Sequence, residues 1–184
     1  MARAAKSPTK AAAPKARSKA AKTKRAGAQA PALAVWDDAK AQAELDVFID
    51  RYTPGVAALG RAALAHMARR LPGAVSLAYD NYNAVAVGFA PAGKAAVMSI
   101  ALYPRWVNLF FLKGAGLPDP DRLLEGKGST VRSIRITDAA QLKDPRIDAL
   151  IATALLSAGW RLDPKARNTL VIQSISPTQR PRRP

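Results

Sequence analysis

The first 34 residues carry nine lysine and arginine side chains and no acidic one. Flexible cations of this kind bind polyanions, because they neutralise phosphates and release the counterions condensed around a nucleic acid. If half of these charges engage DNA, the salt slope is about −4, and affinity falls roughly a few hundredfold between about 50 and 200 mM salt. We therefore predict non-specific binding of DNA or RNA by Lys6, Lys10, Lys15, Arg17, Lys19, Lys22, Lys24 and Arg25.

The same segment lacks the side chains that build a core or read a base. Between Ala2 and Ala32 there is no Leu, Ile, Val, Phe, Tyr or Trp. Such a segment cannot bury enough apolar surface to offset its ordering entropy, so residues 1–34 are predicted to form a disordered arm. Base stacking and sequence readout are not expected from it. A solubilising tail or an organelle transit peptide is the alternative, although a transit peptide needs large apolar residues.

A second group of candidates combines aromatic rings with cations in the middle of the chain. Polar aromatics and an arginine near predicted strand ends can line a ligand pocket, and they can equally pack a sheet edge. The segment 126–130, Gly-Lys-Gly-Ser-Thr, is not a P-loop, because a glycine follows the lysine and a strand is predicted next. It is either a turn or a modest anion site. The candidate ligand-binding residues are Tyr82, Arg105, Trp106, Lys127 and Arg132.

Iron binding would have to use carboxylates, because the chain has no cysteine and one histidine. Five acidic residues lie on the predicted first helix. At about 100° per residue, Asp46 and Asp50 are neighbours one turn apart, whereas Asp37 and Glu44 share another edge. The acids do not converge on one cluster, and a solvated helix face is the alternative interpretation. The metal candidates are Glu44, Asp46 and Asp50, with iron as the candidate cofactor.

Other chemistry is excluded by residue types and patterns that the sequence lacks. Without cysteine there is no disulfide framework, thiolate metal site or thiol nucleophile. His66 is the only histidine, and no GxSxG motif indicates a hydrolase. No stretch approaches the roughly 18 apolar residues of a membrane helix, so no membrane partner is expected. The lack of cysteine fits a cytoplasmic location.

The formal charge of +16 is concentrated at the two ends of the chain. The arm contributes nine positive charges and residues 180–183 contribute three, whereas residues 35–179 carry 17 basic and 13 acidic side chains, a net of +4. Residues 176–184 contain three prolines and are predicted to form a short disordered tail. The body, residues 35–175, is predicted to be one domain.

Periodicity and capping signals predict the elements of that domain. Helices are expected at 37–51 and 53–70, and a third helix should begin at Asp144-Pro145 and stop before Gly159. Strands are expected at 75–79, 84–89, 95–102, 106–112, 131–136 and 169–175. The predicted class is α+β, with a mainly antiparallel sheet of five to six strands, two N-terminal helices and one C-terminal helix. Strand 106–112 is apolar on both faces, so we expect it to be central and covered on both sides.

Four segments then resemble the YdhG-like domain family of bacterial proteins: YDNYN (79–83), LYPRWVNLFFLKGAGLPDP (102–120), LLEGKGSTVRSIRI (123–136) and LVIQSIS (170–176). The resemblance covers about 42–177 and excludes the arm. It implies a small α+β domain similar to frataxin, with helices on one face of an antiparallel sheet. At least one bacterial relative is regarded as an intracellular iron chaperone.

Three functions therefore stay open. The preferred one is a non-enzymatic, cytoplasmic binding protein, in which a YdhG-like domain is tethered non-specifically to nucleic acid by its arm. The alternative is a frataxin-like iron-binding or iron-chaperone module. The third is an enzyme or small-ligand binder that uses the region of Arg105, Trp106 and Lys127.

Overall fold

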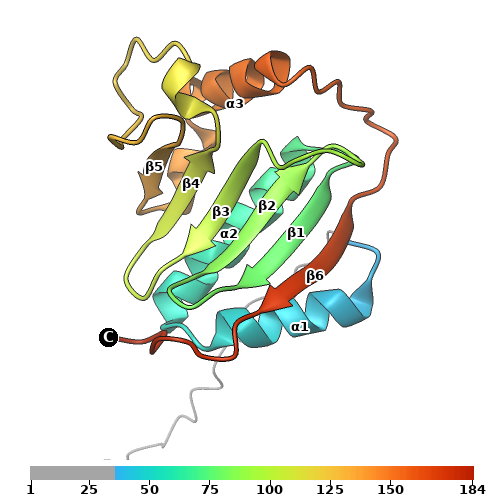
Figure 1. The fold of residues 1–184 in the computed structure, drawn as a ribbon, viewed down its shortest axis with the longest axis vertical. Coiled ribbons are helices and arrows are strands. Elements are labelled where there is room, and N and C mark those ends of the chain that lie inside the picture. Colours follow the sequence, from blue (N-terminus) through green and yellow to red (C-terminus); the bar gives the residue numbers. More distant parts are fainter. Residues whose placement is uncertain (1–35) are drawn as a thin grey trace, which may run out of the picture.

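Residues 36–184 are described by a computed structural model, in which helices and strands are mixed along the chain (Figure 1). The elements are α1 (Ala39–Asp50), α2 (Pro54–Arg70), β1 (Val75–Asp80), β2 (Val85–Ala90), β3 (Met98–Leu102), β4 (Val107–Phe111), η1 (Gly114–Gly116), β5 (Arg132–Ile136), η2 (Ala139–Lys143), α3 (Pro145–Ser157) and β6 (Thr169–Ile175). The predicted α+β class is confirmed. The predicted arm lies outside the described residues.

The six strands form one mixed sheet in the order β5-β4-β3-β2-β1-β6. Neighbouring strands are antiparallel except β1 and β6, which run parallel. The parallel pair arises because the chain passes through α3 between β5 and β6 and crosses to the far edge of the sheet. The predicted sheet is thus corrected to a mixed one. The third helix, α3, begins after Asp144 as predicted, but it is not C-terminal, because β6 and the tail follow it.

Side-chain caps and prolines set the helix starts. The Asp38 carboxylate accepts hydrogen bonds from the backbone N–H groups of Lys40 and Ala41, which have no partner inside α1. Thr53-Pro54 and Asp144-Pro145 begin α2 and α3 with proline in the first turn, where no N–H is needed. The starts of α2 and α3 were predicted from the sequence, because capping is a local interaction.

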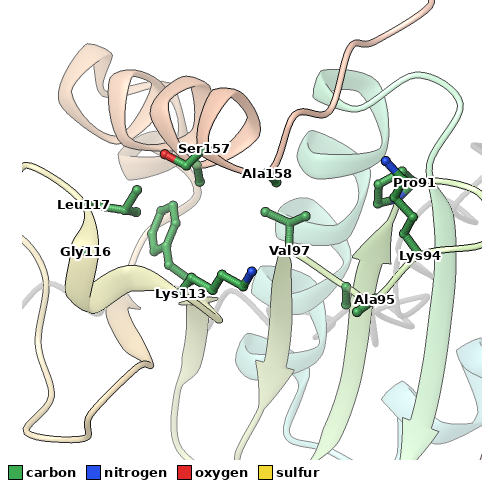
Figure 2. Close-up of a pocket in the computed structure, with 12 residues that line it drawn as sticks. Pro91, Lys94, Ala95, Val97, Lys113, Gly116, Leu117, Ser157 and Ala158 are labelled. Carbon is green, nitrogen blue, oxygen red and sulfur yellow. The ribbon is translucent and has the colours of Figure 1, made fainter.

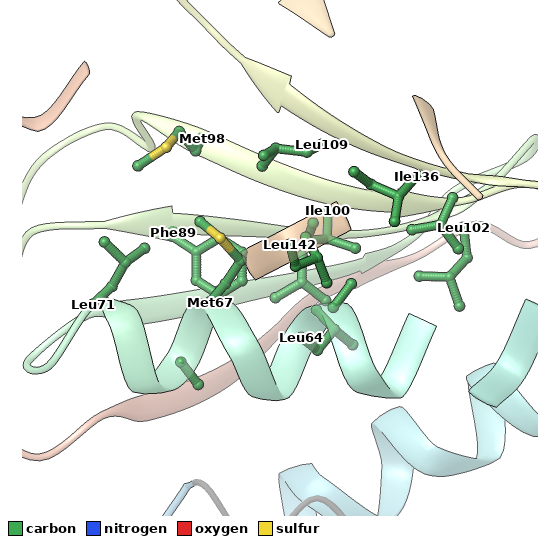
Figure 3. Packing of buried hydrophobic residues seen from close by; sticks show 14 of the residues in the cluster. Leu64, Met67, Leu71, Phe89, Met98, Ile100, Leu102, Leu109, Ile136 and Leu142 are labelled. Carbon is green, nitrogen blue, oxygen red and sulfur yellow. The ribbon is translucent and has the colours of Figure 1, made fainter. Parts of the chain in front are cut away.

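The main hydrophobic core lies between α2 and one face of the sheet (Figure 3). Leu64 and Met67 of α2, and Leu71 directly after it, are fully buried against strand residues that alternate along β2 and β3, namely Phe89, Met98, Ile100 and Leu102. Gly60 permits this close approach, because a Cβ there would clash with the Leu102 side chain. The helix layer is therefore held at a fixed distance from the sheet.

Tyr52, between α1 and α2, ties the helices to one end of the sheet. Its hydroxyl donates to the carbonyl oxygen of Leu102 at 2.7 Å and accepts from the backbone N–H of Val85 at 2.9 Å. The side chain is 1% exposed, and burial raises the pKa of the phenol. This contact fixes the sheet end at which β1 and β3 finish.

The other face of the sheet has no helix in front of it in Figure 1, where α1 and α2 lie behind the strands. Val107, Leu109 and Phe111 of β4 are buried towards the helices, but Phe110 is only half-buried on the open face. The predicted central strand covered on both sides is thus wrong: β4 lies one strand from the edge. Among residues 36–184, no helix is long and apolar enough to span a membrane.

Candidate nucleic-acid interface

The predicted ligand-binding residues do not form one site. Arg105 and Trp106 precede β4, whereas Arg132 begins β5, which pairs antiparallel with β4 so that Arg132 lies opposite Phe111 at the other end. Lys127 is in the loop just before Arg132. The predicted grouping of Arg105, Trp106 and Lys127 is therefore corrected, because the length of the strand separates them.

A groove of about 580 Å³ lies at the end of the sheet where β3 turns into β4. Prolines and Asn83 line it together with five side chains that can contact a ligand through rings or charges: Tyr103, Arg105, Trp106, Arg180 and Arg183. We call it the tail groove, because residues 180–184 of the C-terminal tail form one wall. It contains two of the five predicted ligand-binding residues.

Two aromatic rings, those of Tyr103 and Trp106, line this groove. Tyr103 and Trp106 stack with ring centroids 5.5 Å apart and planes inclined by 27°, and the hydrogen bond from the Tyr103 N–H to the Trp106 carbonyl closes their turn. The guanidinium of Arg135, on the open face of β5, lies 4.7 Å from the Trp106 ring centroid, a cation–π distance. Burial raises the pKa of Tyr103, so its hydroxyl stays protonated at neutral pH.

The C-terminal tail reaches this groove because a buried carboxylate anchors it. Asp80, at the end of β1, is fully buried and accepts hydrogen bonds from Arg51, from Gln179 at 2.7 Å and from Arg182 at 2.7 Å. The Arg182 side chain is itself 3% exposed. The predicted disordered tail is thus corrected: residues 176–184 lie against the body, because a buried charge requires charged partners.

Flanking contacts position the two tail arginines of the groove. The Arg180 N–H donates to the carbonyl of Tyr82 at 2.9 Å, and its guanidinium lies 5.7 Å from the Tyr82 ring. Arg183 donates from Nε to the carbonyls of Arg51 and Tyr52, both at 3.2 Å. These carbonyls end α1, where the helix carries partial negative charge. Tyr82 therefore holds the tail instead of lining the groove.

The groove is electrostatically positive. Arg105, Arg180 and Arg183 line it, Arg135 lies beside it, and none of its lining side chains is acidic. The charge of Asp80 nearby is buried and already paired with Arg51 and Arg182. Cations beside stacked rings favour an anionic ligand that also has flat faces.

The loop before β5 is built as a turn. Arg132 donates from one guanidinium nitrogen to the carbonyls of Gly128 and Val131, at 2.6 and 2.8 Å. Gly126 adopts φ 124°, a conformation that favours glycine. Lys127 is exposed and does not line the tail groove. Of the two interpretations of segment 126–130, these contacts favour the turn.

Two of the three predicted metal ligands contact an arginine. Arg61 of α2 contacts Asp46 at 3.0 Å and Asp50 at 2.6 Å, and no bond links Glu44 to either of them. Within residues 36–184, no three His, Asp or Glu side chains are grouped as a metal ion would require. The predicted carboxylate site is therefore corrected to an interhelical ion pair. His66, half-buried on α2, lies apart, and burial lowers its pKa.

Sequence reasoning missed Arg135, Arg180 and Arg183 as members of a site. Arg180 and Arg183 counted only as tail charges, and no local pattern shows that Asp80, a hundred residues away, positions them. Arg135 could be found only once β5 is known to pair with β4, which places it opposite Asn108 and close to Trp106.

The eight predicted nucleic-acid-binding residues of the arm lie outside the described residues. The described chain starts at Trp36, whose indole N–H donates to the Ser76 hydroxyl at 3.0 Å, near the beginning of β1 and away from the tail groove.

Comparison with protein-family models, with curated proteins and with solved structures finds no match for this chain. The resemblance to the YdhG-like family therefore stays an expectation based on sequence motifs.

Proposed function

We propose that this protein is a non-enzymatic nucleic-acid-binding protein that uses two elements. The lysines and arginines of residues 1–34 bind phosphates without sequence preference, and the tail groove binds an exposed, single-stranded segment of the same molecule. The observation that carries the proposal is the stacked pair Tyr103 and Trp106, flanked by arginines and free of acidic lining residues.

The chemistry of the groove fits single strands better than duplexes. Unpaired bases expose flat faces that stack on aromatic rings, while arginines neutralise the adjoining phosphates. A duplex hides those faces, so it would contact the cations alone. The guanidinium of Arg135 lies 4.7 Å from the Trp106 ring centroid, so a phosphate next to a base stacked on the Tyr103–Trp106 pair has a cation close by.

The YdhG-like identity, the frataxin-like fold and the cytoplasmic location belong to the same proposal. The four motif segments support the family, and α1 and α2 behind a largely antiparallel sheet support the fold. Iron binding is the less favoured alternative, because a cation at Asp46 and Asp50 would have to displace Arg61.

The test measures the affinity of the full chain for a fluorescent single-stranded oligonucleotide and for a duplex of the same length, at several salt concentrations. Deleting residues 1–34 should weaken binding to both by about a hundredfold at 50 mM salt and flatten the salt dependence. Trp106→Ala should weaken only the single strand, by about tenfold, because one stacking contact is lost.

Two matched arginine variants test whether the position of a positive charge, and not only the total charge of the protein, determines binding. Arg105→Gln should weaken single-strand binding severalfold, whereas Arg161→Gln, an exposed arginine that does not line the groove, should not. Unchanged affinity after deletion of the arm would refute its role. Equal losses for single strand and duplex in Trp106→Ala would refute the stacking role of the groove.

A further inference from the structure

A second cavity, of about 390 Å³, lies at the opposite end of the sheet from the tail groove (Figure 2). We call it the α3 pocket, because the last turn of α3 forms one wall with Ser157 and Ala158. The loop between β2 and β3 and the segment after β4 form the others. Its volume is within the range of about 300 to 1,000 Å³ that is typical of small-molecule sites.

The pocket exists because small side chains separate α3 from the sheet. Ala154 and Ala158 face the cavity from the helix, and Ala95 and Ala96 face it from the loop. Val97, Phe111 and Leu117 supply larger apolar surface between them. Val97 and Leu117 remain half-exposed to the cavity, so an apolar ligand would bury surface that the folded chain leaves uncovered.

Two lysines flank this apolar surface. In Figure 2 the Lys113 side chain extends towards Val97, and the Lys94 amine lies beside Pro91. No lining residue is acidic, and neither lysine forms an ion pair with any residue from 36 to 184. Two unpaired ammonium groups beside an apolar cavity favour a ligand with one anionic group.

We propose that the α3 pocket binds a small monocarboxylic acid with an apolar body, of the size of a medium-chain fatty acid. The carboxylate contacts Lys113 and Lys94, and the hydrocarbon lies against Val97, Phe111 and Ala154. The end of α3 supports this orientation, because the negative end of the helix dipole repels an anion. The carboxylate therefore occupies the lysine side of the pocket, away from α3.

This binding is independent of the proposed nucleic-acid function. The α3 pocket and the tail groove share no lining residue and lie at opposite ends of β4. An oligonucleotide is too large for the α3 pocket.

The experiment titrates octanoate into the full chain and follows binding by calorimetry and by the thermal unfolding midpoint. Octanol and octyltrimethylammonium are the neutral and cationic comparison ligands. Octanoate should bind and raise the midpoint, octanol should bind at least fivefold more weakly, and the cation should not bind. Added salt should weaken octanoate binding but not octanol binding.

Lys113→Gln should weaken octanoate binding by about fivefold, and the double variant with Lys94→Gln by roughly twentyfold. Lys143→Gln removes an exposed lysine outside the pocket and should have no effect. Ala95→Trp fills the pocket from an exposed position and should abolish binding of octanoate and octanol, whereas Ala115→Trp, also exposed but not lining the pocket, should not.

Three results would overturn the proposal: no octanoate binding by the folded full chain, equal affinity for octanoate and the cation, or octanoate binding that Ala95→Trp leaves intact. Retained oligonucleotide affinity in each pocket variant separates a failure of this inference from a failure of the proposed function.

Discussion

At the end of the sheet where β1 and β3 finish, loops and tail bring guanidinium groups and stacked rings together, whereas the end where β2 and β4 finish holds small apolar side chains beside two lysines. Both cavities are basic at their rims. They differ in how they are built: the tail groove depends on a distant segment held by Asp80, but the α3 pocket depends on alanines that leave space beneath a helix. One sheet thus presents two different binding chemistries.

Removing Arg182, which anchors the tail, should have the largest effect, and this effect should be confined to one of the two cavities. Arg182→Ala leaves the buried Asp80 with Arg51 and Gln179 only, which should lower the free energy of unfolding by about 3 kcal/mol. Single-strand binding should fall with it, while octanoate binding at the α3 pocket should persist in the folded variant. Denaturant unfolding and the two titrations check this. Arg180→Ala, an exposed control, should change stability by less than about 0.5 kcal/mol. A stability loss no larger than that of the control would contradict the role given to Asp80.

Tyr52→Phe tests how firmly the groove end is fixed to the helices. The variant loses hydrogen bonds to the Leu102 carbonyl and the Val85 N–H, which should cost about 2 kcal/mol of unfolding free energy. Tyr82→Phe, half-exposed, is the matched control and should cost little.

The same tyrosine predicts a dependence on alkaline pH. Burial raises the folded-state pKa of Tyr52 above its ordinary value of 10.0, so the folded chain holds the phenolic proton more tightly than the unfolded chain. This contribution to stability is complete below pH 10 and is lost as the pH rises through the folded-state pKa. Tyr103 shifts in the same direction, so Tyr52→Phe should reduce the alkaline loss without removing it. Unfolding curves between neutral and strongly alkaline pH measure it, and an identical alkaline loss in both proteins would argue against the burial of this hydroxyl.

Asp46→Asn with Asp50→Asn should have a moderate effect, confined to stability. Arg61, half-buried between the helices, loses both carboxylates, at a cost of about 1 kcal/mol. Titration with ferrous iron should give background binding before and after the substitution, because Arg61 already contacts both carboxylates. Iron binding that the double substitution abolishes would instead favour the iron-chaperone alternative.

The smallest effect on stability and on binding is expected from a substitution outside both cavities. Lys127→Gln changes an exposed side chain that lines neither cavity, so stability should change by less than about 0.5 kcal/mol. Oligonucleotide and octanoate affinities should both stay within about twofold of the parent. A large loss of either would mean that the loop before β5 contributes to that site.

Much of the secondary structure could be predicted because its signals are local. Thr53-Pro54 and Asp144-Pro145 mark helix starts through contacts within a few residues, and these two starts are confirmed, whereas the first helix, predicted from residue 37, begins at Ala39 after the cap Asp38. The apolar residues on both faces of β4 were also recognised in the sequence, but the conclusion that both faces are covered was wrong. An aromatic residue such as Phe110 has the same sequence signature on an open face as in a covered one.

The candidate site was predicted only in part. Arg105 and Trp106 were found because they adjoin a strand end, whereas Lys127 was grouped with them wrongly. Asp46 and Asp50 were correctly placed one turn apart, but their partner Arg61 is on another helix. Pairings between elements have no signal in a single sequence unless a motif specifies them.

The sequence by itself determined the helix starts, the alternation of strand residues and the concentration of positive charge at the two ends, because each depends on residues close together in the chain. Only the tertiary structure decided that β6 runs parallel to β1 and that Arg182, 102 residues from Asp80, pairs with it. A buried carboxylate is costly unless cations pair with it, and these cations can come from any part of the chain that the fold brings close. For that reason the tail that looked like a solvated cluster of charge and proline became one wall of a groove.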